Sequence, residues 1–153
     1  MKTNRVLVSI LLLLAIVTGG FAMIMEMPFD KLVSESVIIA VASMKSANKQ
    51  QADAQGNAKL ENTIVIEEVL KGTGKAGDEI VVDTIADFED SAVFEPKTKF
   101  IVFLTKATDA THYQTTNMIQ GYWPIDEKGR LAKMGTGKTK EQVIETIKKT
   151  SKK

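Results

Sequence analysis

The stretch Phe100-Ile101-Val102-Phe103-Leu104 is the most apolar part of the chain outside its N-terminal segment. This run of consecutive apolar side chains is too short for a typical helix and suits a buried strand. The sequence therefore predicts that residues 100–104 form the central strand of a β-sheet.

Apolar, β-branched runs on both sides of this stretch predict further strands. Residues 46–59 lack an apolar period and predict an exposed loop between two strands. Glycines within residues 71–78 mark a turn, and residues 126–129 predict a hairpin turn. The further strands are expected at residues 37–41, 63–70, 79–84 and 122–125.

Helices are predicted only at the two ends of this β-rich region. Residues 28–35 form a short helix or turn, while Thr139 and Gln142 make a capping box for a last helix. We therefore expect a mainly β fold, a small antiparallel, OB-like barrel of about five to seven strands with a short N-terminal helix and a C-terminal helix. The expected domain is single and covers residues 28–150.

The N-terminus carries an export signal. Lys2 and Arg5 precede an uncharged, apolar run at residues 6–17, and Ala22 offers a small residue before a cleavage point. A signal peptide at residues 1–22 is the leading interpretation, with an uncleaved membrane anchor at residues 6–25 as the alternative. Both interpretations predict an extracytoplasmic domain, which contacts the membrane only if the anchor is retained.

Charge and composition exclude several classes of function. Without residues 1–22, 18 Lys plus Arg stand against 19 Asp plus Glu, which gives no attraction to nucleic acid. The chain has no cysteine, so disulfides, thiolate zinc sites and a cysteine nucleophile are excluded. We expect a monomer that is stabilised by packing alone and that holds no cofactor or metal.

Four segments together resemble a group of small exported bacterial proteins of unassigned function. The segments span much of residues 29–125: Leu32-Val33-Ser34-Glu35-Ser36-Val37-Ile38-Ile39, Ile66-Glu67-Glu68-Val69-Leu70-Lys71-Gly72, Phe100-Ile101-Val102-Phe103-Leu104 and Gln120-Gly121-Tyr122-Trp123. The resemblance implies a small antiparallel barrel like those of OB folds and of the inhibitory domain of tissue metalloproteinase inhibitors. Those inhibitors chelate zinc through an N-terminal cysteine, which is absent here, so the resemblance brings a shape without catalytic residues.

The string Ala132-Lys133-Met134-Gly135-Thr136-Gly137-Lys138-Thr139 fits a loose phosphate-binding loop pattern. A true nucleotide loop follows a buried parallel strand, and Arg130-Leu131-Ala132 is poorly apolar for that role. We interpret the string as a glycine-containing linker into the last helix.

Two other features of the sequence have both structural and functional interpretations. His112 is the single histidine, so a site with two histidine ligands is excluded, and we expect a partly exposed turn residue. Asp87, Glu89 and Asp90 offer oxygen ligands for a weak calcium site, but their spacing is irregular and indicates a solvated loop.

The predicted ligand-binding surface combines aromatic and acidic residues: Tyr113, Tyr122, Trp123, Asp87 and Asp90. Core packing is the competing interpretation for the aromatic rings, while Pro124 indicates an edge strand or a bulge. We expect a non-enzymatic binding module of the cell envelope with a protein or glycan partner. The alternatives are an exported hydrolase using carboxylates such as Glu67 and Glu68, or an inhibitory or structural module.

Overall fold

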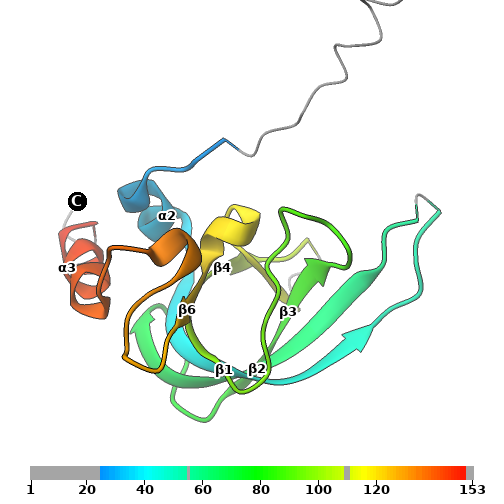
Figure 1. Ribbon diagram of the computed structural model, residues 1–153, viewed down its shortest axis with the longest axis horizontal. Coiled ribbons are helices and arrows are strands. Elements are labelled where there is room, and N and C mark those ends of the chain that lie inside the picture. The colour runs from blue at the N-terminus through cyan, green and yellow to red at the C-terminus, as the bar shows by residue number, and fades with distance from the viewer. Residues whose placement is uncertain (1–24, 55, 109–110, 151–153) are drawn as a thin grey trace, which may run out of the picture.

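The computed structural model describes residues 25–54, 56–108 and 111–150 of the chain. This part is mainly β, with one helix before the strands and one after them (Figure 1). The elements are α2 (Phe29–Glu35), β1 (Ile38–Lys49), β2 (Lys59–Lys71), β3 (Glu79–Ile85), β4 (Lys99–Lys106), β5 (Tyr113–Thr115), the 3-10 helix η1 (Met118–Gly121), β6 (Tyr122–Ile125), the 3-10 helix η2 (Lys133–Gly135) and α3 (Lys140–Thr150).

The N-terminal predictions fall largely outside this part. The predicted signal peptide 1–22 lies wholly outside the described residues, and the alternative anchor 6–25 does so except for Met25. Within the described ranges, no helix combines the length and the apolar character needed to cross a membrane.

Five of the strands close into a barrel. Around the ring the order is β1-β2-β3-β5-β4, and pairing of β4 with β1 completes it. β6 pairs with β4 and is the last strand in the sheet order. The prediction that residues 100–104 form the central strand is confirmed, because β4 pairs with β1, β5 and β6. Pro124 lies on the edge strand, as its missing N–H requires.

The barrel is mixed, so the prediction of an antiparallel barrel is wrong at one pairing. β3 and β5 pair in parallel, while the other strand pairs of the ring are antiparallel. The reason is parity, because strand direction cannot alternate all the way around a closed ring with an odd number of members. β3 and β5 both run in the direction of β1, and the parallel pair therefore falls where they meet.

The interior of the barrel is one of two apolar cores. Alternate residues of the strands point inward, as the pleat requires, and most of these side chains are wholly buried. This barrel core consists of Ile38, Ala40, Ala42, Ile64, Ile66, Val82, Ala92, Phe94, Phe100, Val102, Leu104 and Tyr122.

The second core covers the outside of β1, β4 and β6. Ile39, Ile101 and Phe103 point outward there and meet Leu32 and Val33 of α2 and Val143 of α3. Figure 1 shows the two helices side by side against the barrel wall. Because β1 and β4 are buried on both faces, their sequences read as continuous apolar runs rather than alternating ones. We call this set, which also contains Val41, Trp123, Leu131 and Ile147, the outer core.

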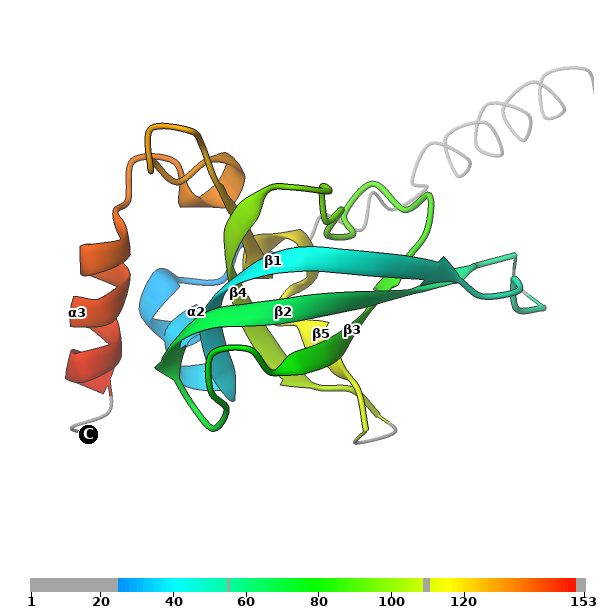
Figure 2. The ribbon, with the colours of Figure 1, turned by 90° about the horizontal axis from the view of Figure 1, so that it is seen from below.

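The loop predicted at residues 46–59 is shorter than expected. β1 continues to Lys49 and β2 begins at Lys59, so only residues 50–58 connect them. The extra residues pair backbone to backbone, for example Asn48 with Glu61, while their side chains on β1 are exposed. These residues therefore form strands without an apolar pattern in their sequence. Figure 2 shows this ribbon extending away from the side that carries α3.

The C-terminal helix begins as the sequence predicts. The backbone N–H of Thr139 donates to Gln142 Oε1 at 2.9 Å, and the N–H of Gln142 donates to Thr139 Oγ1 at 3.3 Å. The predicted capping box is therefore confirmed. At the end of α2, Lys71 Nζ donates to the backbone carbonyls of Val33 and Ser34, at 2.7 and 3.1 Å. Carbonyls in the last turn of a helix have no hydrogen-bond partner within the helix, and Lys71 supplies one.

Candidate functional site

A polar cluster lies on the outside of the barrel, across β2, β3 and the residue that precedes β5. It contains Glu61, Asp83 and His112, whose ligand-type atoms all lie within 4.8 Å of one another. Glu61 and Asp83 are direct partners in the β2–β3 register, and the parallel pairing of Val82 with Tyr113 brings His112 beside them. The inward direction of Asn62 and Val82, which are both buried, leaves Glu61 and Asp83 on the outer face.

Lys59 supplies the positive charge in this cluster. Its Nζ lies 3.1 Å from Asp83 Oδ2 and 3.5 Å from Glu61 Oε1. The hydrogen bond to Asp83 raises the pKa of Lys59 above its ordinary value. Two carboxylates directly opposite each other on neighbouring strands repel, so the arrangement requires a cation between them.

Further polar contacts orient the three side chains. His112 Nδ1 lies 3.0 Å from Asp83 Oδ1, and Gln50 Nε2 donates to Glu61 Oε2 at 2.8 Å. The side chains of Glu61, Asp83 and His112 are 26%, 14% and 25% exposed, so the cluster is half-buried but accessible to solvent. Two cavities, of about 310 and 340 Å³, border Asp83, and Gln114 lines both.

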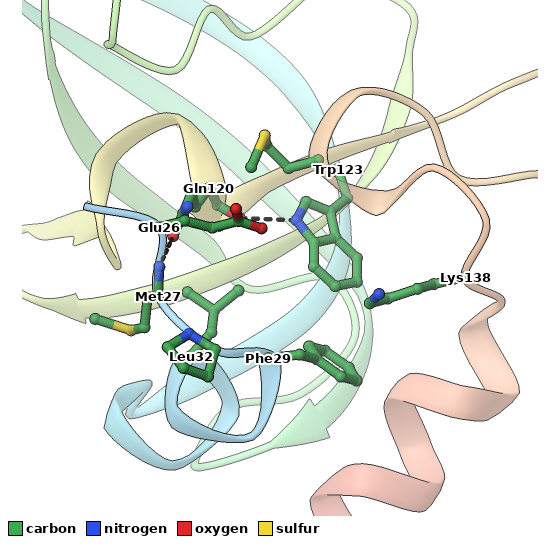
Figure 3. A pocket seen from close by; sticks show the side chains of 9 residues that line it. Glu26, Met27, Phe29, Leu32, Gln120, Trp123 and Lys138 are labelled. Carbon is green, nitrogen blue, oxygen red and sulfur yellow. Dashed lines mark hydrogen bonds between the residues drawn. The ribbon is translucent and has the colours of Figure 1, made fainter. Parts of the chain in front are cut away.

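A second candidate site is a pocket of about 270 Å³ between α2, η1 and the chain that leads into α3 (Figure 3). Phe29, Trp123 and Lys138 lie around the same space, and the Lys138 ammonium is 5.4 Å from the centroid of the Phe29 ring. The apolar lining also includes Leu32 and Met134. We call this the Phe29–Trp123 pocket.

Hydrogen bonds hold one wall of the Phe29–Trp123 pocket in place. The Trp123 indole N–H donates to the carbonyl oxygen of Gln120 at 2.7 Å, and Gln120 Oε1 accepts the backbone N–H of Met27 at 2.9 Å (Figure 3). Gln120 is 5% exposed, so this connection is fixed within the structure. The pocket therefore has an aromatic side held by hydrogen bonds and a partly exposed lysine, Lys138, on its lining.

The structure distributes the predicted ligand-binding aromatic residues over two faces of the sheet. Tyr122 lies in the barrel core with no exposed area, and Tyr113 packs at the edge of that core. Trp123, the next residue after Tyr122, points the opposite way into the outer core, because neighbouring strand residues alternate. Tyr122 therefore presents no surface for a ligand, whereas Trp123 lines a pocket.

The predicted acidic residues lie apart from that pocket. Asp87 is exposed and pairs with Lys49 at 3.0 Å, while the backbone carbonyl of Asp90 accepts the N–H of Ile119 at 3.0 Å. Among the described residues, Asp87, Glu89 and Asp90 do not come together as a metal-binding group. Their contact with a ligand stays a prediction.

Two other sequence motifs have structural partners. Glu67 pairs with Lys99 of β4 and Glu68 with Lys140 of α3, so these adjacent carboxylates face different parts of the molecule. In the glycine-containing string, Gly135 lies where an added Cβ would come within 3.0 Å of Trp123 and Leu131. This glycine permits close packing against the outer core.

Sequence reasoning missed Glu61 and Asp83 as site residues and assigned His112 to a turn. Glu61 lies on β2, Asp83 on β3 and His112 just before β5. Only strand register brings them together, so no local spacing marks them. No protein-family model and no curated protein matches the chain. Its function must therefore be argued from the geometry of these sites.

Proposed function

We propose that this protein is an extracytoplasmic, non-enzymatic binding module of the cell envelope. Its N-terminal segment directs export, and the barrel domain then binds a partner outside the cytoplasm. We further propose that the barrel is of the OB-like type, with the two flanking helices packed on its wall. The closed ring of five strands with one parallel pair supports this assignment.

The observation that carries the binding proposal is the Phe29–Trp123 pocket. Binding pockets are concave and mostly apolar, with a few polar groups that orient the ligand. Here Phe29, Leu32 and Met134 supply apolar lining, while Glu26 and Lys138 supply charge. Its volume of about 270 Å³ suits one side chain of a partner rather than a large cofactor.

The orientation of Trp123 favours a protein partner over a glycan. A sugar ring stacks on an exposed aromatic face, but Trp123 is only 2% exposed and its rings pack against Phe29 and Phe103. A side chain inserted into the pocket needs no such face. In our proposal the partner places an apolar side chain beside Phe29, and one of its carbonyl or carboxylate groups accepts a hydrogen bond from Lys138.

The experiment is affinity capture from envelope extracts with the purified protein as bait, followed by mass spectrometry and measurement of affinity with the captured partner. Met134→Glu alters a pocket residue that is 40% exposed, and Val93→Glu makes the same kind of change at a residue that is 62% exposed and does not line the pocket. We expect the partner to be lost or weakened at least about tenfold with Met134→Glu only. Equal affinity of the two variants would refute the pocket as the binding site.

One observation favours an exported hydrolase as a second candidate. The contact between Asp83 and His112 resembles the carboxylate–imidazole pair that orients a general base. Ester or peptide hydrolysis that disappears in His112→Gln, with folding intact, would support this alternative. Activity that persists in that variant would eliminate it.

A further inference from the structure

We infer that Glu61, Asp83 and His112 form a binding site for a divalent transition-metal ion of the Zn²⁺ class. This inference is independent of the Phe29–Trp123 pocket. It rests on one imidazole nitrogen and two carboxylates that meet on the outer face of the barrel within 4.8 Å of one another. Imidazole and carboxylate together suit zinc and its neighbours, and the site needs no cysteine.

The distances suit coordination with little movement. Zn²⁺ binds nitrogen and oxygen ligands at about 2.0–2.2 Å, so two ligands of a tetrahedral site lie roughly 3.3–3.5 Å apart. His112 Nδ1 and Asp83 Oδ1 are already 3.0 Å apart. An ion between them requires only that these atoms separate slightly and that Glu61 approach through side-chain rotation.

Paired strands hold two of the three ligands, and the third directly precedes a strand. Glu61 of β2 and Asp83 of β3 are partners in an antiparallel ladder that runs from Lys59 with Ile85 to Val65 with Glu79. His112 directly precedes β5, which pairs with both β3 and β4. Sites built on paired strands keep their geometry better than sites on loops.

The charge of the cluster also calls for a cation. Lys59 offsets only one of the two negative charges of the facing carboxylates, and its side chain is 42% exposed. A divalent ion takes the place of the ammonium group between Glu61 and Asp83. Binding through Nδ1 displaces the proton that Nδ1 shares with Asp83 in the metal-free protein, so the metal-bound ring carries its proton on Nε2, and no redox change is involved.

A cavity beside the cluster borders one of the three ligands, Asp83, and gives it access to solvent. It measures about 340 Å³ and is lined by Lys59, Asp83 and Gln114. Three protein ligands leave a fourth position of a tetrahedral site for water or for a ligand atom from a partner.

The test uses the purified protein without an affinity tag. Zn²⁺ binding is measured by calorimetry and Co²⁺ binding by visible absorption, and both should saturate at one ion per chain. Because His112 is the single histidine, its ring nitrogens are assigned at once in a ¹⁵N spectrum, and the Nδ1 signal should shift on addition of Zn²⁺. Absence of saturable binding, or an unchanged Nδ1 signal, refutes the site.

Two variants give changes of opposite sign. His112→Gln should weaken Zn²⁺ binding at least about tenfold. Lys59→Met removes the competing cation and should tighten Zn²⁺ binding roughly two- to tenfold. If the cluster served only as a salt bridge, the same variant would lose a contact and gain no affinity for Zn²⁺. Glu79→Gln, which changes a half-exposed carboxylate of β3 that pairs with Lys45 away from the cluster, is the matched control and should leave affinity unchanged. Equal affinity of wild type and His112→Gln, or weaker binding by Lys59→Met, overturns the inference. Thermal melts in EDTA show whether each variant is folded. If a variant is unfolded, the shift of the Nδ1 signal in the wild-type protein decides.

Discussion

The ring of Trp123 lies 4.6 Å from the ring of Phe103, centroid to centroid, on the outside of the barrel wall. Phe29 of α2 packs against both rings, at 5.3 Å from Trp123 and 6.4 Å from Phe103. This contact joins β4, β6 and α2, so the outer core fixes the helix to the barrel. It also supports one wall of the Phe29–Trp123 pocket, and stability and binding therefore depend on the same aromatic group.

We predict that Phe103→Ala lowers the free energy of unfolding by about 3–5 kcal/mol, because it empties a wholly buried aromatic position. Denaturant unfolding followed by circular dichroism measures the change. Phe88→Ala is the control, since Phe88 is 44% exposed and its loss should cost less than about 1 kcal/mol. Similar values for the two variants would show that β4 is not central to the fold.

Local sequence patterns predicted much of this fold. The unbroken apolar runs of β1 and β4 were recognisable because those strands are buried on both faces. The exposed end of β1 carries no such signal, since its residues pair only through the backbone with β2. The parallel contact of β3 with β5 depends on how many strands close the ring, which the sequence left between five and seven.

The candidate sites were harder to predict for a related reason. Glu61 falls between the predicted loop 46–59 and the predicted strand 63–70, so its partnership with Asp83 in the ladder was not foreseen. As the single histidine, His112 was interpreted as a partly exposed turn residue, and the structure places it beside two carboxylates. Trp123 was recognised as an aromatic candidate, but Phe29 and Lys138 join it only through tertiary packing.

Tyr122 gives a prediction that separates ring packing from hydrogen bonding. Its ring lies 4.9 Å from Phe94 and 5.1 Å from Phe100, and its hydroxyl accepts the N–H of Glu95 at 3.4 Å. Tyr122→Ala should cost about 3–5 kcal/mol in the free energy of unfolding, while Tyr122→Phe should cost less than about 1 kcal/mol. Denaturant titration measures both values. A large loss in Tyr122→Phe would instead assign the stabilisation to the hydroxyl group.

Asp126 gives a prediction about acid stability. Its Oδ1 accepts the N–H groups of Arg130 and Lys128, at 2.8 and 2.9 Å, and Oδ2 accepts the Arg130 guanidinium. These bonds, that from the Arg130 backbone first, hold the pKa of Asp126 below its ordinary value of 3.8. The carboxylate of Asp126 is therefore protonated at a higher pH in the unfolded chain than in the folded chain. Its stabilising effect is present above pH 3.8 and is lost as the pH falls through the lower pKa of the folded state.

The measurement for Asp126 is the difference in unfolding free energy between wild type and Asp126→Asn, between about pH 6 and pH 2. We expect wild type to be the more stable protein at the upper end and its advantage to shrink as the pH falls below about 3.8. An advantage that stays constant over this range would show that the carboxylate charge does not stabilise the turn.

Gly72 and Gly77 provide a matched pair for the turn between β2 and β3. Both have φ of +92°, so the conformational strain of placing alanine in a left-handed backbone is the same at either position, roughly 1–2 kcal/mol. Their surroundings differ, because a Cβ on Gly72 would lie 2.1 Å from the backbone carbonyl oxygen of Val37, whereas nothing lies within 4 Å of one on Gly77. The comparison therefore isolates the cost of the steric clash.

We predict that Gly72→Ala destabilises the protein by at least about 2 kcal/mol more than Gly77→Ala does, as measured by chemical denaturation. The carbonyl of Val37 belongs to the chain that enters β1, so relief of the clash must move the backbone where Lys71 pairs with Ile39. That movement would also pull Lys71 away from the carbonyls at the end of α2. Equal costs at the two positions would mean that β1 and the end of β2 do not approach as closely in solution as the structure has them.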